Sequence, residues 1–440
     1  MRVGVLAVYR PQFNQAVAQR EATQVQDAIG QLPGLEAVWL SMLNEWEAAE
    51  ALPRLDSAWG ELDALVGVMG SFVGADVAVQ IARRIKCPLI LWALPEPSVG
   101  GGRLELNSLC GGIMTNHAFK QMGAEIPMIY GNPRDQDVTR SLLSILRVEN
   151  TRAKLRNAEI GVVGQHPPGY YPCEYDELEL YSRLGVRVTK IPLSEAFAAG
   201  DEASDADLAA ARNAAGHLVG LDTINPDQVT RSVKAEYGLR RLISERNLTS
   251  ITVECWPQYM TEYGGAVCWA MNRLIDDQVM AGCEADVYGT VTMILCRELG
   301  GESPFFGDLV HTVSDDRLVF WHCGAAPLSL AGEAPRASVH PNRKVGLTLD
   351  FALKGGPATV LRLHHDARGF ALMAIEGEAV ADPLYFSGNT AAVRTVRPPA
   401  KVLAGLLNDG AEHHFALGYG VALADVERLG KRLDIPVYVY

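Results

Sequence analysis

Residues 282–293 of the chain read GCEADVYGTVTM. Two acids, Glu284 and Asp286, stand in this otherwise small and apolar run, at the point where a helical pattern begins. Isolated carboxylates are costly to bury, so acids in such a run usually have a cation, an arginine or backbone N–H groups beside them. We therefore expect the rest of the chain to be organised around this stretch.

Another acid and several histidines follow at wider spacing. Asp308 lies in the apolar run FFGDLV at residues 305–310, His322 follows the apolar VFW, and His413 and His414 form a pair near the end. Carboxylate oxygens together with one imidazole suit Mn²⁺ or another hard-to-borderline divalent ion. We predict that these residues are drawn together around a catalytic metal.

The composition indicates a globular protein of two or three domains. The chain has 440 residues, of which 48% are hydrophobic and 21% charged. A net charge of −13 argues against nucleic acid as a main partner, although a local arginine pocket could still bind an anionic substrate. No apolar run is long enough to span a membrane, and residues 1–9 resemble a buried strand rather than a signal peptide. We expect a cytoplasmic protein with no membrane partner.

The eight cysteines include no CxxC pair, and several lie in apolar runs. They are expected to be free core thiols of a protein in a reducing compartment.

The hydrophobic pattern predicts an α/β fold that changes character after residue 300. Continuous apolar strands separated by helices are typical of a parallel sheet that is covered on both faces, with ligands at the carboxyl ends of the strands. After residue 300, short strands alternate with turn residues, which favours an antiparallel sheet or barrel. Strands are expected at residues 3–9, 35–43, 64–69, 88–93, 158–164, 186–191, 250–254, 318–322, 345–351, 358–364 and 370–378, and helices at 14–32, 174–184, 228–246, 267–281, 401–407 and 423–433.

We therefore predict three domains. Residues 1–152 and 153–300 would form two Rossmann-like, doubly wound α/β domains, the second of which carries Glu284. Residues 301–440 would form a mainly antiparallel, barrel-like β domain that completes the active site.

The order of these motifs resembles that in the L-fucose isomerase and L-arabinose isomerase superfamily. The resemblance rests on CEAD at residues 283–286, FGD at 306–308, the strand ending at His322, and AEHHF at 411–415. It implies the three-part architecture, a trimer or hexamer whose subunits share an active site, and metal-dependent isomerisation of an aldose to a ketose.

Carried onto this chain, the resemblance makes Glu284, Asp308 and His414 the ligands of a divalent metal, usually Mn²⁺, with Mg²⁺ or Co²⁺ as alternatives. It also makes Glu284 and Asp308 the catalytic carboxylates and His322 a further active-site histidine. Asp286 is a candidate to support the metal ligands or to replace Glu284 as a ligand. Because neighbours on a strand face opposite ways, one of His413 and His414 is expected to be the ligand and the other to support the site; the motif match favours His414 as the ligand, and the alternative stays open.

The chemistry fits these residue types. Moving a proton between adjacent carbons through an ene-diolate requires a carboxylate in reach and electrostatic stabilisation of the developing charge. The sugar, possibly sulfonated or phosphorylated, is expected to meet polar and aromatic side chains; the candidates are His322, Trp256, Gln258, Trp92, Ser108 and His117. Two alternatives are an inactive sugar-binding or regulatory protein of the same fold, and a metal-dependent epimerase or lyase that uses the same ene-diolate.

Overall fold

The computed structural model describes residues 1–314 and 316–440 and divides the chain into two compact units, Met1–Ala153 and Lys154–Tyr440. The boundary lies next to the predicted one at residue 152. The further division at residue 300 stays a prediction.

The first unit is built on a parallel sheet, as predicted. Its five strands lie in the order β2-β1-β3-β4-β5, and every neighbouring pair is parallel. Successive strand residues point to opposite faces, and both faces are buried. On β1, Val3, Val5 and Ala7 pack into one apolar cluster while Leu6 and Val8 pack into another. Helices therefore cover both sides of this sheet, which explains the continuous apolar strands.

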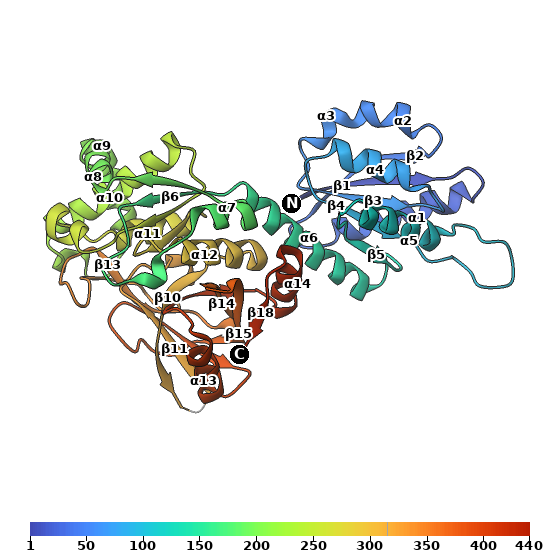
Figure 1. Ribbon diagram of the computed structural model, residues 1–440. Coiled ribbons are helices and arrows are strands. Elements are labelled where there is room, and N and C mark those ends of the chain that lie inside the picture. The colour runs from blue at the N-terminus through green and yellow to red at the C-terminus, as the bar shows by residue number, and fades with distance from the viewer. Residues whose placement is uncertain (315) are drawn as a thin grey trace. The chain divides into compact units, whose positions relative to one another are not determined.

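The elements of this unit begin with β1, and the side chain of Asn14 caps the first helix by accepting a hydrogen bond from the N–H of Val17. They are β1 (Arg2–Tyr9), α1 (Gln15–Gly30), β2 (Glu36–Asn44), α2 (Ala48–Ala51), α3 (Asp56–Trp59), β3 (Ala64–Met69), α4 (Ala75–Arg84), β4 (Leu89–Ala93), α5 (Ser108–Gln121), β5 (Met128–Tyr130) and α6 (Gln136–Arg156), which crosses the boundary between the units (Figure 1).

The second unit starts with another parallel sheet, of four strands in the order β7-β6-β8-β9. Short apolar strands such as β8 (Ser250–Val253) are buried throughout, because helices pack beside them. The other elements are β6 (Glu159–Val163), α7 (Glu177–Leu184), β7 (Arg187–Ile191), α8 (Leu193–Asp201), α9 (Asp205–Ala215), α10 (Pro226–Glu245), α11 (Cys268–Asp276), β9 (Met280–Cys283) and α12 (Val287–Gly300).

A largely antiparallel sheet follows. Six strands, in the order β16-β11-β10-β17-β14-β15, are antiparallel to their neighbours, and β15 pairs back onto β16, so this part of the sheet closes like a barrel. The barrel-like prediction is confirmed. Its elements are β10 (Phe305–Val313), β11 (Arg317–His322), β12 (Arg336–Ser338), β13 (Thr348–Ala352), β14 (Gly356–Asp366), β15 (Gly369–Val380), β16 (Asn389–Thr395), α13 (Pro399–Asp409), β17 (His414–Tyr419), α14 (Leu423–Leu433) and β18 (Val437–Val439).

Helix α12 joins the two sheets of the second unit. Its first ten residues, 287–296, include no charged side chain and are all buried. A helix without a polar face needs partners all round, and α12 packs on β8 and β9 as well as on β14 and β17 of the barrel (Figure 1). Asp286 caps its first turn by accepting a hydrogen bond from the N–H of Gly289 at 2.7 Å. The acidic stretch therefore lies where the two sheets meet.

One predicted element is wrong. The helix expected over residues 267–281 ends at Asp276, and a separate strand, β9, begins at Met280. The run is apolar throughout, so periodicity could not separate the buried helix from the short buried strand that follows it.

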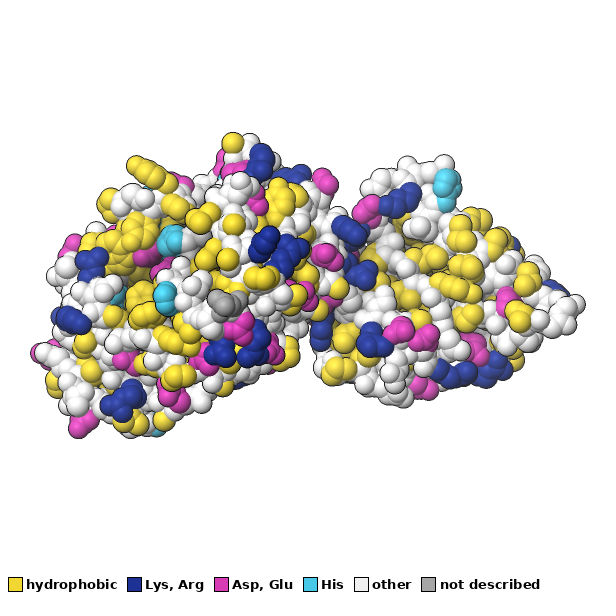
Figure 2. Space-filling model, turned by 90° about the horizontal axis from the view of Figure 1, so that it is seen from below, with side chains coloured by type: hydrophobic (Ala, Val, Ile, Leu, Met, Phe, Trp, Pro, Cys, Tyr) yellow, Lys and Arg dark blue, Asp and Glu magenta, His cyan; other side chains and the backbone are white. Residues whose placement is uncertain are grey.

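The surface carries charges of both signs. Figure 2 shows acidic and basic side chains interspersed with hydrophobic ones over the visible face of each unit. Among the described residues, no helix combines the length and hydrophobicity that crossing a bilayer requires.

Candidate active site

A cavity of about 340 Å³ opens in the second unit, beside the ends of β8 and β9 and the barrel strands β10, β11 and β17. It therefore adjoins the carboxyl edge of the parallel sheet, where α/β folds bind ligands. The residues that line it are Tyr170, Cys255, Trp256, Cys283, Glu284, Asp308, Trp321, His322, Cys323, His340, Asn342, Arg343 and His414.

Glu284 enters the cavity from a strained turn. It directly follows β9, and both Glu284 and Ala285 have left-handed backbones, with φ of 57° and 55°. Non-glycine residues adopt this conformation at a cost, and such strain gathers at functional sites. The Nε1–H of Trp256 donates to Glu284 Oε1 at 2.7 Å. Burial raises the pKa of Glu284, but His413, His414 and Trp256 together outweigh it, so the pKa lies below its ordinary value.

His414 is oriented by a buried carboxylate. Its Nδ1 lies 2.9 Å from Asp286 Oδ2, and Arg362 binds the same oxygen at 2.6 Å. The side chains of these three residues are at most 2% exposed. Burial alone would raise the pKa of Asp286, but Arg362 and His414 lower it far below its usual range, so the carboxylate stays charged. Asp286 therefore accepts the Nδ1–H of His414 and leaves Nε2 free for a ligand.

Asp308 faces that free nitrogen from the neighbouring strand. Its Cα pairs with that of His414 across β10 and β17, and its Oδ1 lies 3.5 Å from His414 Nε2. Glu284 Oε2 lies 3.6 Å from the same nitrogen. Among the described residues, no hydrogen-bond partner is found for the buried Oδ1 of Asp308. Buried polar atoms are nearly always paired, so this oxygen is suited to bind a cation.

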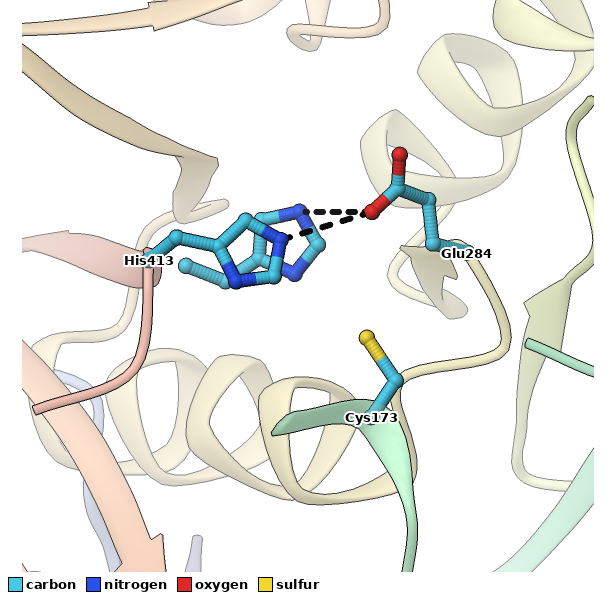
Figure 3. A group of neighbouring side chains, drawn as sticks. Cys173, Glu284 and His413 are labelled. Atoms are coloured by element: carbon cyan, nitrogen blue, oxygen red, sulfur yellow. Dashed lines mark hydrogen bonds and ion pairs between the residues drawn. The ribbon is translucent and has the colours of Figure 1, made fainter. Parts of the chain in front are cut away.

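His413 also faces the site. Its ring stacks on that of His414 with centroids 3.9 Å apart, and its Nε2 lies 3.4 Å from Glu284 Oε2. The expectation that the two histidines face opposite ways is wrong, because His413 precedes β17 and is not held by the strand's alternation. Figure 3 shows His413, Glu284 and Cys173 directed toward one shared space.

One group of side chains has the donor spacing of a metal site, and the predicted donor set overlaps with it. The ligand atoms of Cys173, Glu284, His413 and His414 all lie within 4.8 Å of one another, the one such group found among the described residues. The predicted set of Glu284, Asp308 and His414 shares two of these members. Donors to one Ca²⁺- or Mg²⁺-type ion each lie about 2.0–2.6 Å from it, so donor separations near 3.5 Å are compatible. Burial raises the pKa of Cys173 strongly, and a carboxylate oxygen such as that of Asp308 suits a hard ion better than sulfur does.

Three of the predicted substrate-binding residues belong to the second unit. His322 and Trp256 line the cavity. Burial lowers the pKa of His322, but Cys323, Asp308 and Glu284 outweigh it and raise the pKa to about 9. Gln258 lies two residues beyond Trp256 and is not among the described lining residues, although its Oε1 is buried without a partner. The roles of all three stay predictions.

The other three lie in the first unit. Trp92 is fully buried and donates from Nε1 to the carbonyl of Gly131 at 3.0 Å. Ser108 is also buried and accepts from the N–H of Leu94 at 2.8 Å. His117 is exposed on α5. Trp92 and Ser108 thus form hydrogen bonds within the first unit. A role for Trp92, Ser108 or His117 in substrate binding stays a prediction.

Arg362 and Cys173 were not predicted to belong to the site. Arg362 lies within the apolar run of β14 and Cys173 in a proline-rich loop, both more than 70 residues from Asp286. An arginine in the middle of an apolar strand is itself a signal, because such a charge is rarely buried without a partner.

The chain is similar to several known proteins over most of its length. No family model matches the chain. A sulfoquinovose isomerase from Alkalicoccus urumqiensis is 35% identical over 382 residues, which cover 85% of each chain. One from Priestia megaterium is 34% identical over 88% of this chain and 87% of its own. One from Clostridium sp. is 32% identical over 82% of this chain and 83% of its own.

These relatives span nearly the whole chain and share one name, so neither an inactive binding protein nor an epimerase or lyase is favoured. The chain belongs to the sulfoquinovose isomerase family and is an aldose–ketose isomerase that acts on a sugar.

Proposed function

We propose that this protein is a divalent-metal-dependent isomerase that converts sulfoquinovose, a glucose with a sulfonate in place of the C6 hydroxyl, into its ketose isomer. The observation that carries the proposal is the arrangement of His414, whose Nδ1 is held by Asp286 while Nε2 faces Glu284 and Asp308. The substrate is inferred from the relatives that bear this name.

Glu284, Asp308 and His414 would hold the metal, with Asp286 orienting His414 and with His413 beside Glu284. When bound, a divalent cation stabilises negative charge that develops on the substrate oxygens. Mn²⁺ suits two carboxylates and one imidazole, and Mg²⁺ or Co²⁺ are alternatives.

The carboxylates would perform the proton transfers. The lowered pKa of Glu284 keeps it ionised at neutral pH and therefore able to accept a proton. One of Glu284 and Asp308 takes the proton from the carbon next to the carbonyl and returns it to the adjacent carbon, and the other transfers the hydroxyl proton. The reaction passes through an ene-diolate and needs no external base.

Several wider features belong to the same proposal. The motif order supports membership of the L-fucose and L-arabinose isomerase superfamily, with two Rossmann-like domains, a third domain from residue 301, and an active site shared between the subunits of a cytoplasmic trimer or hexamer. His322, Trp256 and Gln258 would contact the sugar, with Trp92, Ser108 and His117 as contributors from the first domain.

The test is proton exchange at C2 of sulfoquinovose in deuterated water, followed by NMR with metal-stripped enzyme. We expect exchange and ketose formation only after Mn²⁺ or another divalent ion is added. Tight metal binding without exchange would contradict sulfoquinovose as the substrate. Failure to bind a metal would contradict Glu284, Asp308 and His414 as its ligands.

A further inference from the structure

The cavity holds an arginine whose role is not explained by the metal or by the proton transfers. Arg343 is the one arginine or lysine among the described lining residues. Within residues 1–314 and 316–440 it forms no ion pair with a carboxylate, and its guanidinium instead stacks on Trp256, with Cζ 4.4 Å from the ring centroid. We propose that Arg343 binds the sulfonate of the substrate and thereby selects sulfonated over uncharged sugars, an inference that rests on the proposed function.

The turn that carries Arg343 is held in place by a buried histidine. Nδ1 of His340 accepts hydrogen bonds from the N–H groups of Asn342 and Arg343, both at 3.3 Å. The N–H of Lys344 donates to the carbonyl of His340 at 2.8 Å. His340 is only 6% exposed, whereas Asn342 and Arg343 are exposed. His340 therefore anchors the turn from the protein interior. The exposed side chains of Asn342 and Arg343 present N–H donors to the cavity.

Trp256 sets the distance between the two ends of the site. One edge of its indole donates to Glu284, and its face supports Arg343. The carboxylate and the guanidinium are thus separated by little more than the width of one ring. The six-carbon chain of a hexose, with five C–C bonds of about 1.5 Å each, is long enough to span that separation.

Charge then fixes the direction of binding. Glu284 and Asp308 make one end of the cavity acidic and would repel a sulfonate there. The whole chain carries a net charge of −13, so an anionic sugar gains little from the general field and depends on a local cation. Arginine presents planar paired donors to an oxyanion, and stacking on an aromatic ring fixes their orientation. The aldehyde end would consequently lie at the carboxylates and the sulfonate at Arg343.

The test compares sulfoquinovose with quinovose, its counterpart without the sulfonate. In Arg343→Met, we expect KM for sulfoquinovose to rise about 10–100-fold, with little change in kcat and in the kinetics for quinovose. Arg343→Lys should recover part of the loss, because the charge remains but the paired donors do not. Lys344→Met is the matched control: it removes a charge one residue away, from a side chain outside the cavity lining, and should leave both sugars unaffected.

Other outcomes would overturn the inference. An equal loss of activity on both sugars in Arg343→Met would assign Arg343 a structural role. Equal rises in KM for sulfoquinovose in Arg343→Met and Lys344→Met would show that only the general positive charge of this region matters, not a specific contact. If the wild type turned over neither sugar, the proposed function would fail, yet the subsite could still be tested with methanesulfonate. Quenching of tryptophan fluorescence by methanesulfonate that is lost in Arg343→Met would support the subsite, and its absence in the wild type would refute it.

Discussion

The inner and outer walls of the cavity are built in opposite ways. At the inner wall, His414 is backed by Asp286 and Arg362, and the side chains of all three are buried, with Asp286 binding the other two. The outer wall includes Trp256 and Arg343, which are more exposed; Trp256 is held by a hydrogen bond to Glu284 and an edge-on contact with Tyr170, and Arg343 stacks on its ring. A charged group deep in the protein requires fixed partners, whereas a group that must bind a passing ligand requires free donors. On the proposed function, the buried group would orient the metal ligand and the exposed pair would recognise the substrate.

The largest effect is expected where the two walls meet, at Glu284. Glu284→Gln keeps the shape of the side chain and its contact with Trp256, but it removes the negative charge to which we assign both metal binding and proton transfer. We expect kcat to fall at least about 10³-fold, because two roles are lost together, and metal affinity to fall with it. Deuterium exchange at C2 and metal titration would check this. Unchanged affinity would assign the metal to the other donors.

The inner wall should respond to Asp286→Asn in both stability and metal binding. Asparagine can still cap α12, but it leaves Arg362 without its full counter-charge and weakens the orientation of His414. We expect about 10–100-fold weaker metal affinity and a loss of unfolding free energy on the order of 3 kcal/mol, measured by urea denaturation. Asp425→Asn, also a buried acid but on α14, serves as the control that should retain metal affinity.

The pH dependence of this stability loss has a definite sign. The pKa of Asp286 is lower in the folded chain than its unfolded value of 3.8. Its charge therefore contributes stability above about pH 4, and that contribution is lost as the pH falls below this value. The difference between wild type and Asp286→Asn should shrink in acid. A difference that stayed constant down to pH 3 would contradict the ion pair.

The outer wall can be probed at Trp256 with a smaller expected effect. Trp256→Phe removes the hydrogen bond to Glu284 but keeps an aromatic face for Arg343. Because that bond helps to lower the pKa of Glu284, the acidic limb of the kcat/KM profile should move to higher pH, and activity at neutral pH should fall about 3–10-fold. An acidic limb that stayed at the same pH would show that His413 and His414 are sufficient to keep the pKa of Glu284 low.

The sequence made the acids that we propose as catalytic easier to find than the residues around them. Glu284, Asp308 and His414 stand out as polar residues in apolar runs, and the structure brings them together. The ends of β9 and α11 could not be predicted, because a buried helix and a buried strand look alike when neither has a polar face. The contacts of Arg362 with Asp286 and of Arg343 with Trp256 join residues 76 and 87 positions apart, and no local pattern encodes such pairings.

The smallest effect is expected at Cys173, and it distinguishes the two donor sets. Cys173 lies within reach of Glu284 and His413, but its strongly raised pKa disfavours the thiolate that a metal requires. If Asp308 completes the set, Cys173→Ala should keep Mn²⁺ affinity and kcat within about 3-fold and cost about 1 kcal/mol of stability through the small cavity that it leaves. Asp308→Asn should weaken Mn²⁺ binding in the same titration. The reverse result, with affinity lost in Cys173→Ala and kept in Asp308→Asn, would move the metal to the cysteine side and favour a softer ion.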